Sequence, residues 1–271
     1  MIQKRKQRKA LILLILALSL FNVLIIALIM LAGILMDYGR DRRLYHEASE
    51  LAVTSVEQTQ APASASILPE IAASPMPRET SPIEVDFVAL RLKGRHVLGW
   101  LYSANTLINY PVVYYSNSNY YLTRDYTGSH SEGGALFFDC RLTKQLKEQN
   151  LIIYGHHMKD SSMFGSLLQY QKQSYYEEHP TMYLLTPDRN YRIDLFAAQF
   201  TTSEEEKFSV GFESEVKKRE FVQSAISNST FQPKDSAYRA DGQIISLVTC
   251  AYSDYIIDAK FQVHGWLTEI G

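Results

Sequence analysis

A cysteine and a histidine occupy matching places at the ends of two apolar stretches of the chain. Cys250 directly follows the apolar run 244–249, and His156 follows the run 151–154 and one glycine. A thiolate is a strong nucleophile, and a nearby imidazole can act as its general acid and base. The two residue types therefore point to cysteine-based acyl transfer, on condition that the fold brings the two strand ends together.

Each residue also has a simpler interpretation when it is taken alone. Cys250 can be a buried apolar residue, and because the chain has a second cysteine, Cys140, one structural disulfide is possible. His156 can be a solvated loop residue. His157 should point away from His156 on an extended chain. A zinc site of both histidines and Cys250 is a further alternative, but it lacks a fourth ligand at compact spacing.

The first 36 residues have the composition of a membrane anchor. Five basic residues lie within 1–9, and 10–36 contains no charged residue. A helix over 10–36 would be about 40 Å long, which is enough to cross a bilayer. A cleaved signal peptide is the alternative, but its apolar region would be only about 7–15 residues long. We therefore expect a cytoplasmic tail at 1–9, a retained transmembrane anchor at 10–36, and an extracellular remainder.

The rest of the chain divides into a linker and one large domain. Residues 37–83 begin as a polar helical stretch and continue with a Pro-, Ala- and Ser-rich segment, which predicts a juxtamembrane helix and a stalk. Residues 84–271 form the expected catalytic domain. The net charge is -2, and outside the basic tail the chain is acidic overall, which argues against nucleic acid as a partner. The acidic run 204–206 predicts a solvated loop, with calcium binding as the alternative.

The pattern of residues 84–271 is typical of a mostly β domain, a barrel or a sandwich. Residues 191–195 alternate apolar and polar side chains, and with the run 183–185 they predict a hairpin. Helical spacing of apolar residues from Val216 to Ile226 predicts one late helix. The other expected elements are buried strands over 151–154 and 244–249, a helix over 163–168, and a terminal strand with Phe261, Val263, Gly265 and Leu267 on one face.

Several segments, taken in order, resemble the class B sortases. Tyr154-Gly155-His156 resembles the segment that carries the catalytic histidine of that class, and Leu247-Val248-Thr249-Cys250 resembles its Leu-x-Thr-Cys signature. The other matching segments are 109–113, 120–122, 134–139 and the late helix. The resemblance covers about residues 86–267, which is nearly the whole of the expected extracellular domain.

This resemblance implies a closed eight-stranded sortase-type β-barrel with short helices. It also implies a cysteine transpeptidase that needs no metal or organic cofactor. Cys250 would attack a threonine carbonyl in the C-terminal sorting signal of a secreted surface protein or pilin. His156 would serve first as general acid and then as general base. The acceptor would be an amine of a peptidoglycan cross-bridge or of a pilin lysine, and Thr249, Tyr252 and Leu122 would bind the substrate.

One position departs from the family pattern. Class B sortases have an arginine about ten residues after the cysteine, where this chain has Lys260. Lysine keeps the positive charge but lacks the planar fork of donors, and loss of one donor to an oxyanion costs about 3 kcal/mol. Three interpretations stay open: Lys260 takes the place of the arginine, Arg239 or Arg192 reaches the site, or the enzyme is weak or inactive.

Two alternative functions fit the same residues. A membrane-tethered cysteine peptidase would use the same pair with water in place of the amine. A weakly active sortase-like barrel would bind peptides without turning them over. An amine-dependent product distinguishes the transpeptidase from the peptidase, and alkylation of Cys250 at a rate that depends on His156 would count against the binding protein.

Overall fold

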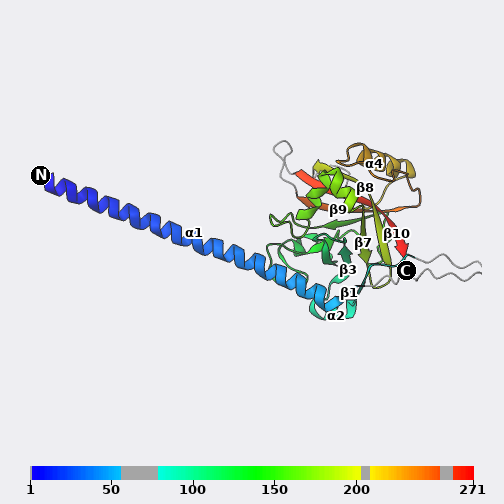
Figure 1. Cartoon of the computed structure of the whole chain (residues 1–271), viewed down its shortest axis with the longest axis horizontal. Helices are drawn as coiled ribbons and strands as arrows, with labels where there is room; N and C mark the ends of the chain where they lie inside the picture. The colour runs from blue at the N-terminus through cyan, green and yellow to red at the C-terminus, as the bar shows by residue number, and fades with distance from the viewer. Residues whose placement is uncertain (1, 56–78, 203–207, 251–258) are drawn as a thin grey trace, which may run out of the picture. The chain divides into compact units, whose positions relative to one another are not determined.

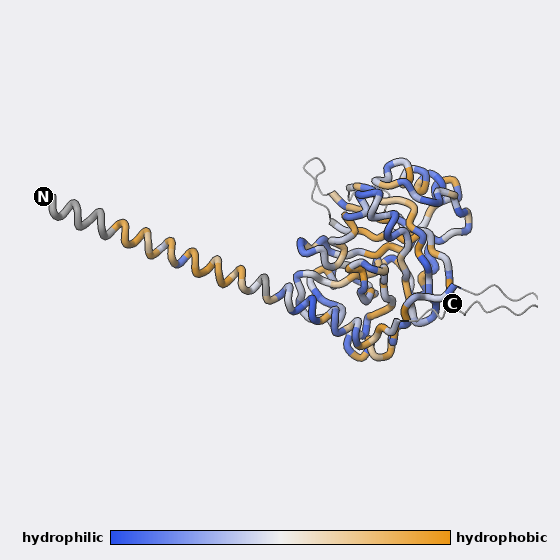
Figure 2. The backbone as a smooth tube through the Cα atoms, viewed as in Figure 1, coloured by the Kyte–Doolittle hydropathy of each residue, from blue (hydrophilic) through white to orange (hydrophobic). Residues whose placement is uncertain are grey.

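The chain forms two compact units, Met1–Arg43 and Leu44–Gly271. The computed structural model describes residues 2–55, 79–202, 208–250 and 259–271. The first unit is a single helix, the greater part of α1 (Ile2–Ala52). Its apolar run, visible in Figure 2, exposes every side chain from 12 to 33. Among the described residues, this is the one helix whose length and composition suit a membrane span.

The last turns of α1 belong to the second unit and pack on it. Tyr45, Ala48 and Ala52 are buried, and their spacing places them on one face of the helix. On the same part of the helix, Ser49 Oγ accepts a hydrogen bond from Asn109 Nδ2 at 2.9 Å. The compact unit therefore begins at Leu44, whereas composition suggested a boundary at residue 84.

A short two-stranded sheet follows α1. β1 (Val53–Ser55) pairs antiparallel with β2 (Ile83–Val85), so that Val53 lies opposite Val85 and Ser55 opposite Ile83. Most of the predicted Pro-rich stalk lies between these strands, at 56–78, outside the described residues. The two flanks of that segment are thus held side by side in one ladder.

Eight strands close into the predicted barrel (Figure 1). Their order around it is β10-β8-β7-β3-β4-β5-β6-β9. The pairs β4–β5 and β6–β9 are parallel and the other pairs are antiparallel. The strands are β3 (Val97–Tyr102), β4 (Asn109–Val113), β5 (Leu136–Phe138), β6 (Asn150–Tyr154), β7 (Thr181–Leu185), β8 (Asn190–Thr202), β9 (Gln243–Cys250) and β10 (Ala259–Ile270).

The two faces of β10 meet different surroundings. Phe261, Val263 and Leu267 are buried in the main core, as their alternation predicts. On the opposite face, Trp266 packs with Val222 of α4 (Glu215–Ser227) in a second apolar cluster. The late helix therefore covers the outside of the barrel and seals the face of β10 that the core does not.

The other helices are short, and one expected helix is displaced. Instead of a helix over 163–168, the structure has the 3-10 helix η2 (Gly165–Gln171). Ser161 and Met163 have positive φ angles, which a right-handed helix excludes, so the helix begins only after them. The remaining helices are α2 (Phe87–Lys93), η1 (Ser118–Thr123) and α3 (Gln173–Glu178).

Candidate active site

Three strands bring the predicted catalytic positions to one end of the barrel. β6 and β9 pair in parallel, with Tyr154 opposite Val248, so both run toward the same end. His156 follows β6 after one glycine, and Cys250 is the last residue of β9. β10 pairs antiparallel with β9 and places Lys260 directly opposite Cys250. The topology thus gathers positions that are distant in the sequence at a single rim.

A pocket of about 260 Å³ lies at this rim. Of the residues predicted from the sequence, His156, Lys260, Thr249 and Leu122 line it, whereas Tyr252 lies outside the described residues. The sequence assigned no site role to the other lining residues, although most of them lie in the segments 134–139 and 151–156 or in the strand before Cys250. They are Asn119, Phe137, Asp139, Tyr154, Gly155 and Val248.

A backbone carbonyl orients the imidazole of His156. The Nε2 atom of His156 lies 2.6 Å from Leu122 O. Because a carbonyl oxygen can only accept, Nε2 carries a hydrogen and donates it. Nδ1 is therefore the ring nitrogen that can take up and release a proton. On the backbone side, Phe164 N donates to His156 O at 3.0 Å.

Gly134 allows the close approach that this arrangement needs. Its φ of +60° lies in the left-handed region, which glycine adopts without strain. A Cβ atom at this position would lie 2.7 Å from Tyr121 O, 2.8 Å from Leu122 O and 3.1 Å from His156 Cδ2. Any larger residue would therefore displace the carbonyl that holds the imidazole.

A buried carboxylate forms part of the pocket wall. Asp139 is 4% exposed and accepts hydrogen bonds from Arg141 Nε at 2.9 Å, Arg141 Nη2 at 2.6 Å and Tyr154 Oη at 3.0 Å. Burial by itself raises the pKa of Asp139, but the bonds from Arg141 and Tyr154 outweigh it, and the net pKa is lowered. Asp139 therefore stays ionised and fixes the hydroxyl of Tyr154 at the pocket.

Replacing Asp139 with asparagine is expected to destabilise the fold by about 2 kcal/mol at pH 7, because charged hydrogen bonds in a buried place are lost. Because the pKa of Asp139 is lower in the folded protein than in the unfolded chain, its carboxylate stabilises the fold at pH values above the unfolded pKa. This stabilisation is lost as the pH falls through the folded pKa. The difference between the two proteins should therefore shrink below about pH 4. Urea unfolding at pH 7 and at pH 3 checks this, with the exposed Asp188→Asn as control. An equal difference at both pH values would contradict it.

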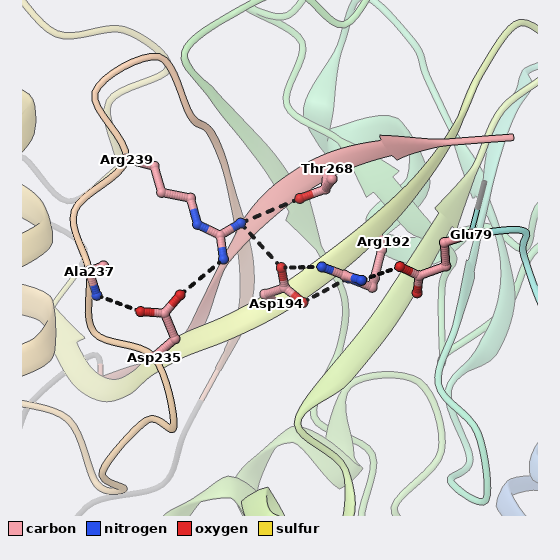
Figure 3. Close-up of polar contacts among 7 residues, drawn as sticks. All are labelled: Glu79, Arg192, Asp194, Asp235, Ala237, Arg239 and Thr268. Atoms are coloured by element: carbon pink, nitrogen blue, oxygen red, sulfur yellow. Dashed lines mark hydrogen bonds and ion pairs between the residues drawn. The ribbon is translucent and has the colours of Figure 1, made fainter. Parts of the chain in front are cut away.

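The structure excludes Arg192 and Arg239 as replacements for the family arginine. Both are bound to Asp194 (Figure 3). Arg192 Nη2 lies 3.1 Å and Arg239 Nη1 lies 3.2 Å from Asp194 Oδ2. Arg192 lies opposite Thr268 on β10, eight residues along the strand from Lys260, which is a distance of about 26 Å. The interpretation that either arginine reaches the pocket is wrong, and Lys260 is the cation that lines it.

The remaining candidates lie apart from the pocket lining. Cys140 is partly buried and is not among the residues that line the pocket. His157 is not among the lining residues; it pairs with Met163 through an isolated bridge, and burial lowers the pKa of His157. Within the described part of the chain, no group of three or more His, Cys, Asp or Glu residues could hold a metal ion. The acidic run 204–206 is outside the described residues.

The sequence is similar to those of two curated proteins. Sortase B of Staphylococcus aureus is 29% identical over 181 residues, which are 66% of this chain and 74% of that protein. Sortase B of Listeria monocytogenes is 30% identical over 161 residues, which are 59% of this chain and 65% of that protein, slightly less than two thirds of its length. No protein-family model matches the chain.

Solved structures have the same fold. A Staphylococcus aureus sortase B–substrate complex superposes with a TM-score of 0.64 and 26% identity, over 68% of this chain and 85% of that one. A sortase B from Bacillus anthracis gives a TM-score of 0.69 and 27% identity, over 87% of this chain and 99% of that one. The barrel topology, the shared sequence and these superpositions identify a sortase-type cysteine transpeptidase and support its placement among the class B sortases.

Proposed function

We propose that the protein is a membrane-anchored transpeptidase that cleaves a C-terminal sorting signal through a thioester on Cys250. The observation that carries this proposal is the meeting of three positions at one rim. Cys250 lies opposite Lys260 in the β9–β10 ladder, and His156 and Lys260 line the same pocket. A nucleophile, a proton carrier and a cation are what a two-step acyl transfer requires.

In the first step the Cys250 thiolate attacks the threonine carbonyl of the sorting signal. A carbon–sulfur bond forms and the scissile carbon–nitrogen bond breaks. His156, protonated on Nδ1, gives that proton to the leaving amine, because its Nε2 hydrogen is engaged with Leu122 O. The C-terminal tail departs with a neutral amine, and the acyl group stays on the enzyme as a thioester.

In the second step an amine replaces the sulfur. The incoming nitrogen attacks the thioester carbonyl, the carbon–sulfur bond breaks, and Nδ1 of His156 takes up the proton that the amine loses. The acceptor is an amine of a peptidoglycan cross-bridge or a lysine of a pilin subunit. The partner in the first step is a secreted surface protein or a pilin that carries the sorting signal.

The remaining pocket residues receive roles that suit their surroundings. Lys260 stabilises the oxyanion and the substrate backbone as a single cationic donor. Thr249 Oγ1 is buried and has no hydrogen-bond partner within the described residues, so it is available to a peptide group of the substrate. Leu122, which is partly exposed at the pocket, and Tyr252 complete the substrate-binding surface.

The proposed location follows from the first helix. Residues 10–36 anchor the protein in the cell membrane, the basic tail at 1–9 stays in the cytoplasm, and the barrel acts outside the cell. The apolar and exposed character of α1 over 12–33 supports this placement. Protease treatment of intact cells, with antibodies against each end of the chain, tests the orientation.

A peptide assay tests the function itself. The full chain is incubated with peptides that carry threonine-containing sorting signals, with or without triglycine or a lysine peptide, and the products are analysed by mass spectrometry. We expect an acyl adduct on Cys250 that becomes an amide product only when an amine is present. A carboxylic acid product despite added amine would identify a hydrolase instead, and peptide binding without an adduct would identify a binding protein.

Lys260→Ala is expected to slow thioester formation about 100-fold, because the developing oxyanion loses a charged donor. Lys260→Arg should stay within about tenfold of the wild type, since it keeps the charge and restores the planar fork. Burst kinetics with a sorting-signal peptide measure both. If Lys260→Ala is as active as the wild type, Lys260 has no catalytic role.

A further inference from the structure

A tyrosine on the last turns of α1 is bonded to the segment that holds the imidazole of His156. Tyr45 is 6% exposed, and its hydroxyl donates to Gly134 O at 2.6 Å, across 89 positions of sequence. Tyr45 belongs to the same compact unit as the barrel and is not among the residues that line the pocket. Any effect of Tyr45 on the chemistry must therefore pass through other residues.

The first connection reaches the ring of His156. The backbone of Gly134 lies so close to Leu122 O that a Cβ atom would stand 2.8 Å from that oxygen and 3.1 Å from His156 Cδ2. Leu122 O is the acceptor for His156 Nε2 at 2.6 Å. A displacement of the Gly134 peptide would therefore move the acceptor and press on the ring at the same time.

The second connection reaches the backbone of His156. The ring of Tyr45 packs edge-on against Tyr110, with centroids 5.3 Å apart. The hydroxyl of Tyr110 accepts a hydrogen bond from Met163 N at 3.1 Å, and the next residue, Phe164, donates its backbone N–H to His156 O at 3.0 Å. Tyr45 thus supports His156 from both the ring side and the main-chain side.

We propose that Tyr45 is a positioning residue that sets the orientation of the His156 imidazole, so that the end of α1 is part of the catalytic apparatus. The catalytic meaning of this inference rests on the proposed function. The hydrogen bond from His156 Nε2, which the inference says Tyr45 keeps in place, can be observed without measuring turnover.

The test compares Tyr45→Phe with Tyr126→Phe in the full-length protein. Both substitutions remove one hydroxyl from neighbouring buried rings, whose centroids are 5.9 Å apart, but the hydroxyl of Tyr126 has no hydrogen-bond partner within the described residues. In ¹⁵N-histidine-labelled protein, with His156 assigned through His156→Gln, we expect a protected Nε2–H signal in the wild type and in Tyr126→Phe. The signal should weaken or shift in Tyr45→Phe.

Turnover gives the second measurement. For Tyr45→Phe we expect kcat for the sorting-signal peptide to fall about tenfold with KM within about twofold, because binding is kept while proton transfer is misaligned. An unchanged Nε2–H signal in Tyr45→Phe, or an equal change in Tyr126→Phe, would overturn the inference. A wild type with the signal but without transpeptidation would overturn the proposed function and leave the positioning role standing.

Discussion

Replacing Cys250 with alanine is expected to abolish acyl transfer, with a fall in turnover of at least about 10⁴-fold. None of the described residues that line the pocket carries a thiol, so without Cys250 the two-step route has no nucleophile. The change removes one sulfur atom at the end of β9, so the barrel should fold as before. Mass spectrometry of the protein after incubation with a sorting-signal peptide measures the adduct directly.

The chain supplies a matched control for this experiment. Cys140 is the only other cysteine, and Cys140→Ala should keep the adduct and the turnover of the wild type. Adduct formation in Cys250→Ala, or its loss in Cys140→Ala, would show that the nucleophile has been misassigned. Circular dichroism of both variants establishes that neither result arises from unfolding.

Gly134→Ala is expected to lower both stability and activity. An alanine at a φ of +60° costs about 1–2 kcal/mol, and the contacts of its Cβ with two carbonyl oxygens add strain. The total loss should be about 2–4 kcal/mol of unfolding free energy. Since Leu122 O must move and it holds the imidazole of His156, turnover should fall about 100-fold in the fraction that remains folded.

Gly211→Ala serves as the matched control, because a Cβ atom there would meet only Gln149 Oε1 at 3.7 Å, an ordinary contact. Thermal unfolding and peptide turnover are measured on both variants at a temperature where each is fully folded. Wild-type turnover in a destabilised Gly134→Ala protein would separate the fold of this segment from the chemistry and contradict our account of His156.

Strands buried on both sides could be predicted from the sequence, since their apolar runs are continuous. The runs 151–154 and 244–249 became β6 and β9, and their parallel pairing brings the positions that follow them to one rim. The hairpin of β7 and β8 was also predicted correctly, with Leu185 opposite Asn190 across its turn. Local pattern sufficed here because alternation and turn residues decide such elements over a few positions.

Features that depend on distant contacts could not be predicted. Tyr45 and Ser49 looked like part of a polar linker, but they bond to Gly134 and Asn109, which lie far along the chain. The burial of residues at the ends of helices could not be predicted for a related reason. Val216 belongs to the apolar stripe of α4 in the sequence but is 64% exposed in the structure. The sequence shows whether a side chain is polar or apolar, but it does not show which distant residues will pack against it.

Some features of the candidate site could likewise be predicted from the sequence, and others could not. The places of Cys250 and His156 in the fold could be predicted, because Cys250 ends β9 and His156 follows β6 after one glycine. The parallel pairing of the two strands brings both positions to one rim, and their catalytic roles stay a prediction. Whether another arginine could do the work of Lys260 depends on which side chains lie near the pocket, and the sequence does not show this. The ladder between β8 and β10 answers it, since Arg192 and Lys260 lie at opposite ends of those strands.

The carbonyl of Leu122 also governs the order of events in the proposed reaction. It occupies Nε2 of His156, so a single nitrogen must protonate the departing amine and later deprotonate the arriving one. The two amines must therefore visit the same place in turn, and the acceptor cannot react until the cleaved tail has left. Because the two amines use one nitrogen in turn, we expect ping-pong kinetics, with parallel reciprocal plots of the initial rates for peptide and acceptor.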